Sequence, residues 1–311
     1  MYTAFHPKEV WLDTDGNVIQ AHGGGILYKD GVYYWYGENK GADNCTVEGK
    51  NLARVDVIGI SCYSSTDLYN WKNEGVVLPA SDDPDSDLYT GKVLERPKCI
   101  YNKRTGKYLL WAHVDTADYK FARAGVAIAD SPTGPFTYLG SFRPNAGEMS
   151  RDMTVFVDDD DVAYLFHSSE DNATMYCSRM NADYTGFDGT YTRNLEGEYR
   201  EAPCVMKRNG RYYMVTSYCT GWAPNVARVA VADSVMGPWT LLGNPCVSEG
   251  AELTYGGQST HILKVEDMED TYIFMADIWK AENLQDSRYM WLPIEWDEDQ
   301  MQIPFVEEWR L

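Results

Sequence analysis

The sequence predicts an all-β protein, a five-bladed β-propeller that forms one domain over residues 1–311. The main observation is a hairpin unit of two apolar runs around a polar turn, which returns five times at intervals on the order of 50 to 75 residues. Further strand-like pieces follow most hairpins, so each unit holds about four strands, as a propeller blade does. Apolar segments with a helical period are almost absent, which indicates little helix.

The hairpins are expected at residues 24–38, 96–112, 152–167, 199–215 and 258–276. Asn209-Gly210 is a typical hairpin turn. Pro203 cannot donate to a central ladder, so it is expected at the start of its strand, which places Glu201 at a strand entrance on the rim. Between the hairpins, residues 129–137 and 232–240 repeat one pattern, and residues 64–71 repeat it loosely. Residues 288–311 are expected to complete the last blade and close the ring.

Composition excludes several functions. The formal net charge of −20 disfavours nucleic acid and anionic membranes as partners, because both would repel the chain. No apolar stretch approaches the roughly 20 residues of a membrane span. The first six residues lack the features of a signal peptide, so location stays open between the cytoplasm and export after removal of a leader. The seven cysteines have no CxxC spacing, so buried reduced thiols are expected, with Cys99, Cys177 and Cys204 in apolar runs.

Two suggestive motifs are set aside. The run Asp158 to Asp161 lacks the glycine and the final glutamate of a calcium loop, and it falls where the other units have their hairpin turn. His22-Gly23-Gly24-Gly25 resembles the oxyanion loop of lipases, but the chain has no Gly-x-Ser-x-Gly nucleophile elbow. The first motif is interpreted as an exposed turn, and a serine hydrolase is excluded.

One position of the repeat is polar in every unit. In a propeller the first strand of each blade lines the central channel, and the start of that strand lies at one mouth. The five residues at this point are His22, Glu95, Asp152, Glu201 and Gln258. Neighbouring carboxylates raise one another's pKa, which is what a general acid needs. Carboxylates around an aromatic-rich pocket favour glycoside hydrolysis.

The chain resembles glycoside hydrolase family 43, a five-bladed propeller family of inverting enzymes, over nearly its whole length. Ser150-Arg151-Asp152 is similar to the family segment whose aspartate tunes and orients the acid. Glu201-Ala202-Pro203 is similar to the general-acid segment, and Gly257-Gln258-Ser259-Thr260-His261 to the last-blade segment. In some members the histidine matching His261 contacts a calcium ion or water in the channel. The resemblance therefore implies that no cofactor is required and leaves a structural calcium open.

The first blade departs from the family pattern, because Ala21-His22-Gly23 has no carboxylate where most members carry the aspartate that acts as base. This departure is a feature of the exo-β-1,3-galactanase branch, subfamily 24. In that branch a last-blade glutamine positions the water, which Gln258 matches, and a second-blade glutamate binds sugar or acts as base, which Glu95 matches. The resemblance implies sugar contacts for Tyr119, Asn172, Thr220 and Trp222. His22 is a further candidate, as is Glu38, although a glutamate after a strand is more often solvated.

The expected activity is exo-cleavage of β-1,3-galactan with release of galactose and inversion. Glu201 would donate the proton, with Asp152 tuning it, and Gln258 would hold the water on the opposite face of the ring, helped by Glu95. The expected partner is a polysaccharide or oligosaccharide, and a monomer is expected. Three alternatives remain: an α-L-arabinofuranosidase or β-xylosidase, a β-mannoside phosphorylase using Arg96, Arg123 and Arg151 for phosphate, and a non-catalytic carbohydrate-binding propeller.

Overall fold

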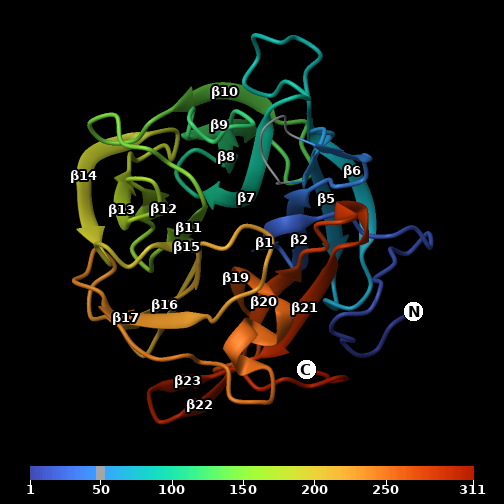
Figure 1. Cartoon of the computed structure of the whole chain (residues 1–311), viewed down its shortest axis with the longest axis vertical. Coiled ribbons are helices and arrows are strands. Elements are labelled where there is room, and N and C mark those ends of the chain that lie inside the picture. The colour runs from blue at the N-terminus through green and yellow to red at the C-terminus, as the bar shows by residue number, and fades with distance from the viewer. Residues whose placement is uncertain (47–52) are drawn as a thin grey trace.

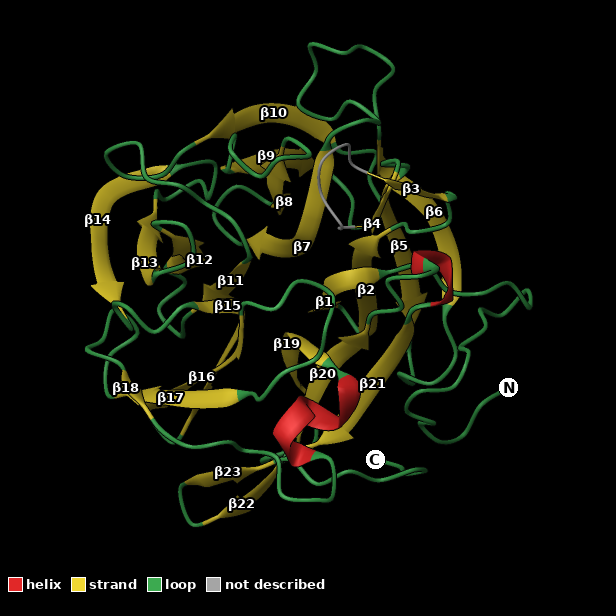
Figure 2. Ribbon diagram, viewed as in Figure 1, coloured by secondary structure: helices red, strands yellow, loops and turns green. Residues whose placement is uncertain are grey.

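The structure, a computed structural model, describes residues 1–46 and 53–311. Figure 1 shows five sheets arranged around a central axis, with the chain passing once around the ring from β1 to β21. Figure 2 shows that strands and loops make up nearly all of the described residues, in which the helical part is two 3-10 segments. The all-β five-bladed propeller predicted from the repeat is confirmed.

Four of the blades are four-stranded antiparallel sheets, each built from strands that follow one another along the chain. Blade 1 contains β1 (His22–Lys29), β2 (Val32–Glu38), β5 (Gly59–Ser65) and β6 (Lys72–Pro79). A small hairpin, β3 (Asn44–Thr46) and β4 (Ala53–Val55), is inserted between β2 and β5. Blade 2 contains β7 (Val93–Asn102), β8 (Lys107–Asp115), β9 (Arg123–Ala129) and β10 (Thr137–Phe142).

Blades 3 and 4 repeat the same order. Blade 3 contains β11 (Met153–Val157), β12 (Ala163–Ser169), β13 (Thr174–Met180) and β14 (Phe187–Asn194). Blade 4 contains β15 (Arg200–Arg208), β16 (Arg211–Tyr218), β17 (Arg228–Ala232) and β18 (Thr240–Leu241). The four-aspartate run is the turn between β11 and β12, as expected, and Asp158 is held there by Lys207 at 2.7 Å.

Blade 5 differs from the expectation of four strands. A 3-10 segment, η1 (Ala251–Gly256), leads into it, and the sheet has three strands: β19 (Gln258–Lys264), β20 (Tyr272–Ile278) and β21 (Arg288–Pro293). A second 3-10 segment, η2 (Leu284–Asp286), precedes β21, and the rest of the chain forms a separate hairpin of β22 (Glu295–Asp297) and β23 (Gln300–Gln302). The final segment therefore supplies one blade strand, and an isolated bridge between Phe5 and Trp309 joins the two ends of the chain.

The first strands of the blades pack against one another around the axis: β1 contacts β7 and β19, and β11 contacts β7 and β15. Hydrophobic clusters fill the spaces between neighbouring blades, for example Trp35, Trp71 and Trp291 between blades 1 and 5. Each of these indoles is 1% exposed, so aromatic residues serve the core here as much as the pocket. Because the blades are wedged by these clusters, the ends of the five inner strands are held at fixed positions.

Two other expectations can be compared with the structure. All seven cysteines are free thiols, and Cys99, Cys177 and Cys204 are buried, as their apolar runs indicated. Among the described residues, no helix has the length and hydropathy that crossing a bilayer would require.

Candidate active site

A pocket of about 110 Å³ opens at the mouth where the inner strands begin. It combines four carboxylates, one guanidinium, one amide and an aromatic wall, contributed by all five blades. The lining residues are Glu38, Glu95, Arg96, Tyr119, Asp152, Glu201, Gly221, Trp222, Gln258 and Trp279. A larger cavity of about 1030 Å³ lies at the other mouth, where the hairpin turns Asn209-Gly210 and 266–270 form its rim. The smaller pocket is the candidate active site, because the convergent carboxylates are there.

β-Bulges aim the polar side chains into this pocket. In four of the five inner strands the pairing register shifts within two residues of the mouth, after His22, Glu95, Glu201 and Ser259. In the first three of these bulges the next residue has a left-handed backbone: Gly23 (φ 59), Arg96 (φ 55) and Ala202 (φ 52). A bulge kinks the strand and turns a side chain out of its regular alternation. Pro203 lies within such a bulge rather than at the strand start, which leaves Glu201 at the rim as predicted.

Glu201 is the candidate general acid. Its Oε1 accepts a hydrogen bond from Gln258 Nε2 at 3.0 Å, and its Oε2 accepts one from Asn172 Nδ2 at 3.3 Å. Burial, followed by the negative charge of Asp152, raises the pKa of Glu201 to about 8. The carboxyl group is therefore protonated at neutral pH and still faces the pocket.

Gln258 is fully hydrogen-bonded. Its Oε1 accepts from Arg96 Nη2 at 2.6 Å and from Trp279 Nε1 at 2.8 Å, while its Nε2 donates to Glu201 and to Ser217 Oγ at 3.0 Å. Two donors on one side and two acceptors on the other fix which end of the amide is oxygen. An inverting enzyme separates its two working groups by about 6.5–9.5 Å to admit sugar and water. Gln258 Nε2 instead lies 3.0 Å from Glu201 Oε1, so the resting site does not have the separation expected of an inverting enzyme.

Arg96 joins three blades at the centre of the site. Its guanidinium pairs with Asp152 Oδ2 at 2.9 Å and donates to Ser259 O at 3.1 Å as well as to Gln258. Asp152 Oδ2 also accepts from Ala202 N at 3.0 Å, the backbone next to the acid. Asp152 thus contacts both Arg96 and the backbone beside Glu201, and its orienting role stays a prediction.

Glu38 brings a carboxylate to blade 1 from its second strand. It is 3% exposed, its Oε1 accepts from Arg96 N at 3.0 Å, and its Oε2 pairs with Lys40 Nζ at 2.6 Å. A Cβ on Gly23 would lie 2.1 Å from Glu38 Oε1, so the glycine makes room for this carboxylate. The first strand of blade 1 has no carboxylate at its mouth, and Glu38 thus brings one close to that place from the neighbouring strand.

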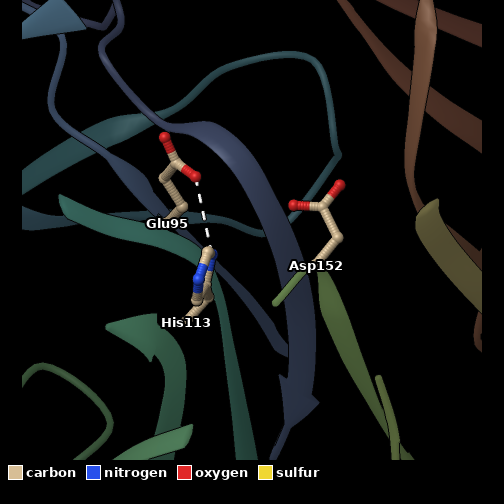
Figure 3. Close-up of side chains that lie close together, drawn as sticks. All are labelled: Glu95, His113 and Asp152. Carbon is tan, nitrogen blue, oxygen red and sulfur yellow. Dashed lines mark ion pairs between the residues drawn. The ribbon is translucent and has the colours of Figure 1, made fainter. Parts of the chain in front are cut away.

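Glu95 lies beside Asp152 and points toward a buried histidine that the sequence analysis did not identify (Figure 3). Its Oε1 accepts from Tyr119 Oη at 3.0 Å, and its Oε2 is 3.5 Å from His113 Nδ1. Burial alone would raise the pKa of Glu95, but His113 and Lys40 outweigh it and lower the pKa to about 2.

Glu95, His113 and Asp152 have donor atoms within 4.8 Å of one another, close enough to share an ion. Two protein cations already meet these charges. Arg96 pairs with Asp152, and Asp115 and Glu95 raise the pKa of His113 to about 9 against the opposing effect of burial. The donor set therefore favours an ion-pair network over a metal site.

Aromatic rings and a buried lysine form one wall of the pocket. Trp222 and Trp279 lie 5.0 Å apart at an angle of 60°, and Lys40 Nζ is 5.6 Å from the centre of the Trp222 ring. Trp222 Nε1 donates to Ala53 O at 2.8 Å, which ties the loop of blade 4 to the hairpin inserted in blade 1. This link closes one side of the pocket.

Three predicted sugar-contacting residues do not line the pocket. His22 is fully buried, stacked on Tyr289 at 4.7 Å between ring centres and 3.7 Å from Asp277. Thr220 turns its hydroxyl to Ala223 O at 2.6 Å, although the next residue lines the pocket. Asn172 reaches the site through Glu201. The other predicted members, Glu38, Tyr119 and Trp222, lie in the lining.

Sequence reasoning missed Lys40, His113, Asp115 and Trp279. His113 carried no such signal, because regular pairing counted back from the turn at residues 102–107 would put Val114 opposite Glu95, and only the bulge between Glu95 and Lys98 brings His113 there. Lys40 and Trp279 follow strand ends in loops, where no periodicity marks them.

The channel below the pocket does not fit a calcium ion at His261. Burial and the nearby Lys98 lower the pKa of His261 to about 3, so its ring is neutral. Lys98 is 3% exposed and donates from Nζ to Gly23 O at 2.8 Å. A Cβ on Gly25 would lie 2.7 Å from Lys98 Cδ and 3.4 Å from the His261 ring, which shows how closely the two pack there. Calcium needs six to eight oxygen ligands, and an amine occupies this place instead.

Comparison with known proteins supports a carbohydrate-active site. The model of the family described as Glycosyl hydrolases family 43 matches residues 20–302. A GH43 β-1,3-galactosidase solved with galactodeoxynojirimycin is 41% identical with a TM-score of 0.92, covering 99% of this chain and all of that one. The exo-β-1,3-galactanase of Phanerochaete chrysosporium, solved with β-1,3-galactotriose, is 34% identical with a TM-score of 0.88, covering 100% of this chain and 68% of that one.

Curated relatives are more distant. An arabinoxylan arabinofuranohydrolase of Paenibacillus polymyxa is 26% identical over an alignment of 244 positions that covers 68% of this chain. The match spans 37% of that protein's length. A xylosidase/arabinosidase of Bacteroides ovatus is 26% identical over 296 residues, covering 81% of this chain and 84% of that protein.

Proposed function

This chain belongs to glycosyl hydrolases family 43 and is a glycoside hydrolase, and we propose that it cleaves β-1,3-galactan from a chain end, releasing galactose with inversion. The observation that carries the proposal is Glu201, a carboxyl group kept protonated at neutral pH in a pocket lined by further carboxylates and two indoles. The substrate class is supported by full-length similarity to a β-1,3-galactosidase and an exo-β-1,3-galactanase.

Glu201 is proposed as the general acid that protonates the leaving glycosidic oxygen. Asp152 orients the adjoining backbone through Ala202 N and keeps the acid protonated by charge repulsion. As the glycosidic bond breaks, Glu201 becomes a carboxylate, and the Nδ2–H of Asn172 is in place to stabilise that charge.

Gln258 is proposed to hold the attacking water, with Glu95 contacting sugar hydroxyls. In the resting site the amide nitrogen of Gln258 donates to Glu201, so the role requires the side chain to rotate when sugar enters. Arg96 and Trp279 hold only the oxygen end. An N–H released from Glu201 can then hold the water, which loses its proton to solvent as it attacks the oxocarbenium-like centre.

Exo action is supported by the closed side of the pocket. The Trp222–Ala53 link walls it on one side, and a small pocket walled in this way suits a chain end better than the middle of a polymer. A polysaccharide or oligosaccharide is the proposed partner, and a monomer is proposed as the active form.

The arabinofuranosidase or xylosidase alternative is favoured by the names of the curated relatives. Against it stands the first blade, where His22 replaces the usual carboxylate and is fully buried. The phosphorylase alternative finds less support, because Arg96 is engaged by Asp152, Gln258 and Ser259. Arg123 and Arg151 donate to the backbone oxygens of Ser141 and Tyr119.

The deciding experiment is product analysis on linear β-1,3-galactan, arabinan and xylan, with and without phosphate, following the first anomer released by NMR. We expect α-galactose from galactan, independent of phosphate. Release from arabinan or xylan alone would overturn the substrate, a sugar phosphate would indicate a phosphorylase, and no cleavage with retained galactan binding would indicate a binding propeller.

A further inference from the structure

Behind Glu95, a chain of buried polar groups runs from the pocket into blade 2. His113 lies opposite Glu95 in the pairing of β7 with β8, and Asp115 follows two residues later on the same face of β8. His113 is 1% exposed and Asp115 is 0% exposed. The order of groups from pocket to interior is carboxylate, imidazole, carboxylate.

Of these three buried groups, Asp115 has the largest number of polar contacts. Its Oδ1 accepts from Thr116 N at 2.8 Å and Ala122 N at 2.9 Å, and its Oδ2 is 2.8 Å from His113 Nε2. A carboxylate accepts and does not donate, so His113 Nε2 carries a hydrogen. The tautomer and orientation of the ring follow from this contact.

The second ring nitrogen faces Glu95. His113 Nδ1 has no hydrogen-bond partner, is buried, and has Glu95 Oε2 at 3.5 Å as its ion-pair partner. A neutral imidazole would place a lone pair against a carboxylate, which is repulsive, whereas an imidazolium donates from both nitrogens. The geometry between two buried carboxylates thus favours the charged ring.

The other polar and charged groups around Glu95 either also favour its ionised form or are carboxylates that a cation already pairs with. Tyr119 donates to it, and Arg96 and Lys40 are further positive charges that lower the pKa of Glu95. Glu38 and Asp152 are negative neighbours, each already paired with Lys40 or Arg96.

We propose that Asp115 and His113 are a positioning pair that holds Glu95 as a permanently ionised acceptor for sugar hydroxyls, so that Glu95 binds substrate and does not serve as the general base. The proposal rests on the function proposed above. A base must take a proton near the working pH, and a carboxylate held against an imidazolium takes one poorly. The attacking water is then held at Gln258 and loses its proton to solvent as it attacks the oxocarbenium-like centre.

The test uses three variants and one direct titration. His113→Gln removes the cation. Asp115→Asn removes the charge behind His113 but keeps an oxygen for the backbone amides of Thr116 and Ala122. His167→Gln is the matched control, because His167 is a buried histidine of the second strand in blade 3 that faces Met149 O and Ser178 Oγ instead of carboxylates.

We expect His113→Gln to raise KM for β-1,3-galactooligosaccharides about tenfold at pH 7 with kcat within about twofold, as weakening one charge-assisted hydrogen bond would. Its kcat/KM should also gain an acid limb, falling between about pH 6 and 4 where the wild type stays flat. Asp115→Asn should show the same limb with a smaller change in KM, and His167→Gln should show neither. A purely structural role would lower stability without adding the limb.

Selective labelling of the five histidines for NMR tests the charge directly, with the His113 signal assigned by its loss in the variant. We expect His113 to stay protonated to pH 8 and His167 to stay neutral down to pH 5. Titration of His113 near its ordinary value, an unchanged pH profile in His113→Gln, or a loss confined to kcat would overturn the proposal. If the wild type cleaves no galactan, the proposed function fails, while the titration still decides the charge of His113. If His113→Gln fails to fold, Asp115→Asn and the titration decide.

Discussion

Replacing Glu201 with glutamine should make the protein both inactive and more stable at neutral pH. The amide has nearly the shape of the protonated acid but cannot give up a proton. Asn172 Oδ1 is buried without a partner, so a flip of that amide can accept the new N–H in place of donating to Oε2. We therefore expect the fold of the pocket to be retained.

The stability gain follows from the raised pKa. An ordinary glutamate titrates near 4.5, and Glu201 titrates at about 8 in the folded chain. The stability associated with this group is complete below pH 4.5 and is lost as the pH rises through 8, because the unfolded chain releases the proton first. At pH 7, about 2.5 units above the pKa of an unfolded glutamate, ionisation lowers the free energy of the unfolded chain by about 3 kcal/mol, at roughly 1.4 kcal/mol per unit. Glu201→Gln does not lose this free energy, because glutamine cannot ionise. For a chain of 311 residues its Tm should therefore be about 5 °C higher than that of the wild type.

The assay measures Tm by calorimetry and kcat/KM on β-1,3-galactan for the wild type and Glu201→Gln at pH 4 and pH 7. The Tm difference should be present at pH 7 and vanish at pH 4, and activity should fall about 10²–10⁴-fold. A nitrophenyl galactoside should lose less, because its leaving group needs little protonation. Glu249→Gln, at an exposed side chain, is the control for both measurements. Activity within tenfold of the wild type, or a Tm difference that is equal at both pH values, would refute the reasoning.

Three further outcomes are expected. The wild-type kcat/KM should fall about tenfold per pH unit above about pH 8, where Glu201 loses its proton, and a midpoint below pH 6 in the pH–rate profile would contradict its role as acid. Trp222→Ala should raise KM about tenfold with kcat nearly unchanged, because it removes one wall of the pocket. The control variant Trp296→Ala, in the C-terminal hairpin, should leave KM unchanged. A loss in kcat alone in Trp222→Ala would argue against a binding role. EDTA or millimolar calcium should shift Tm by less than about 1 °C, because Lys98 occupies the channel beside His261; a rise of several degrees with calcium would show that an ion binds there.

The architecture and the main site residues could be predicted because both depend on local patterns that repeat. Two-residue turns such as Asn209-Gly210 fix hairpin register, and the same polar position before each inner strand recurs five times. Once the repeat is assumed to close into a ring, Glu95, Asp152, Glu201 and Gln258 must converge, and all four line one pocket.

The tertiary structure alone decided what each of these groups contacts. Bulges at Arg96 and Ala202 turn side chains in a way that alternation does not encode, since neither residue is a glycine. Arg96 reaches Gln258 from another blade, and His113 meets Glu95 from the neighbouring strand. The sequence by itself determined the repeat, the ring and the position of Glu201 at the mouth, because these follow from periodicity. The charge states and partners within the pocket follow from distances of a few ångströms between blades, which only the packed core sets.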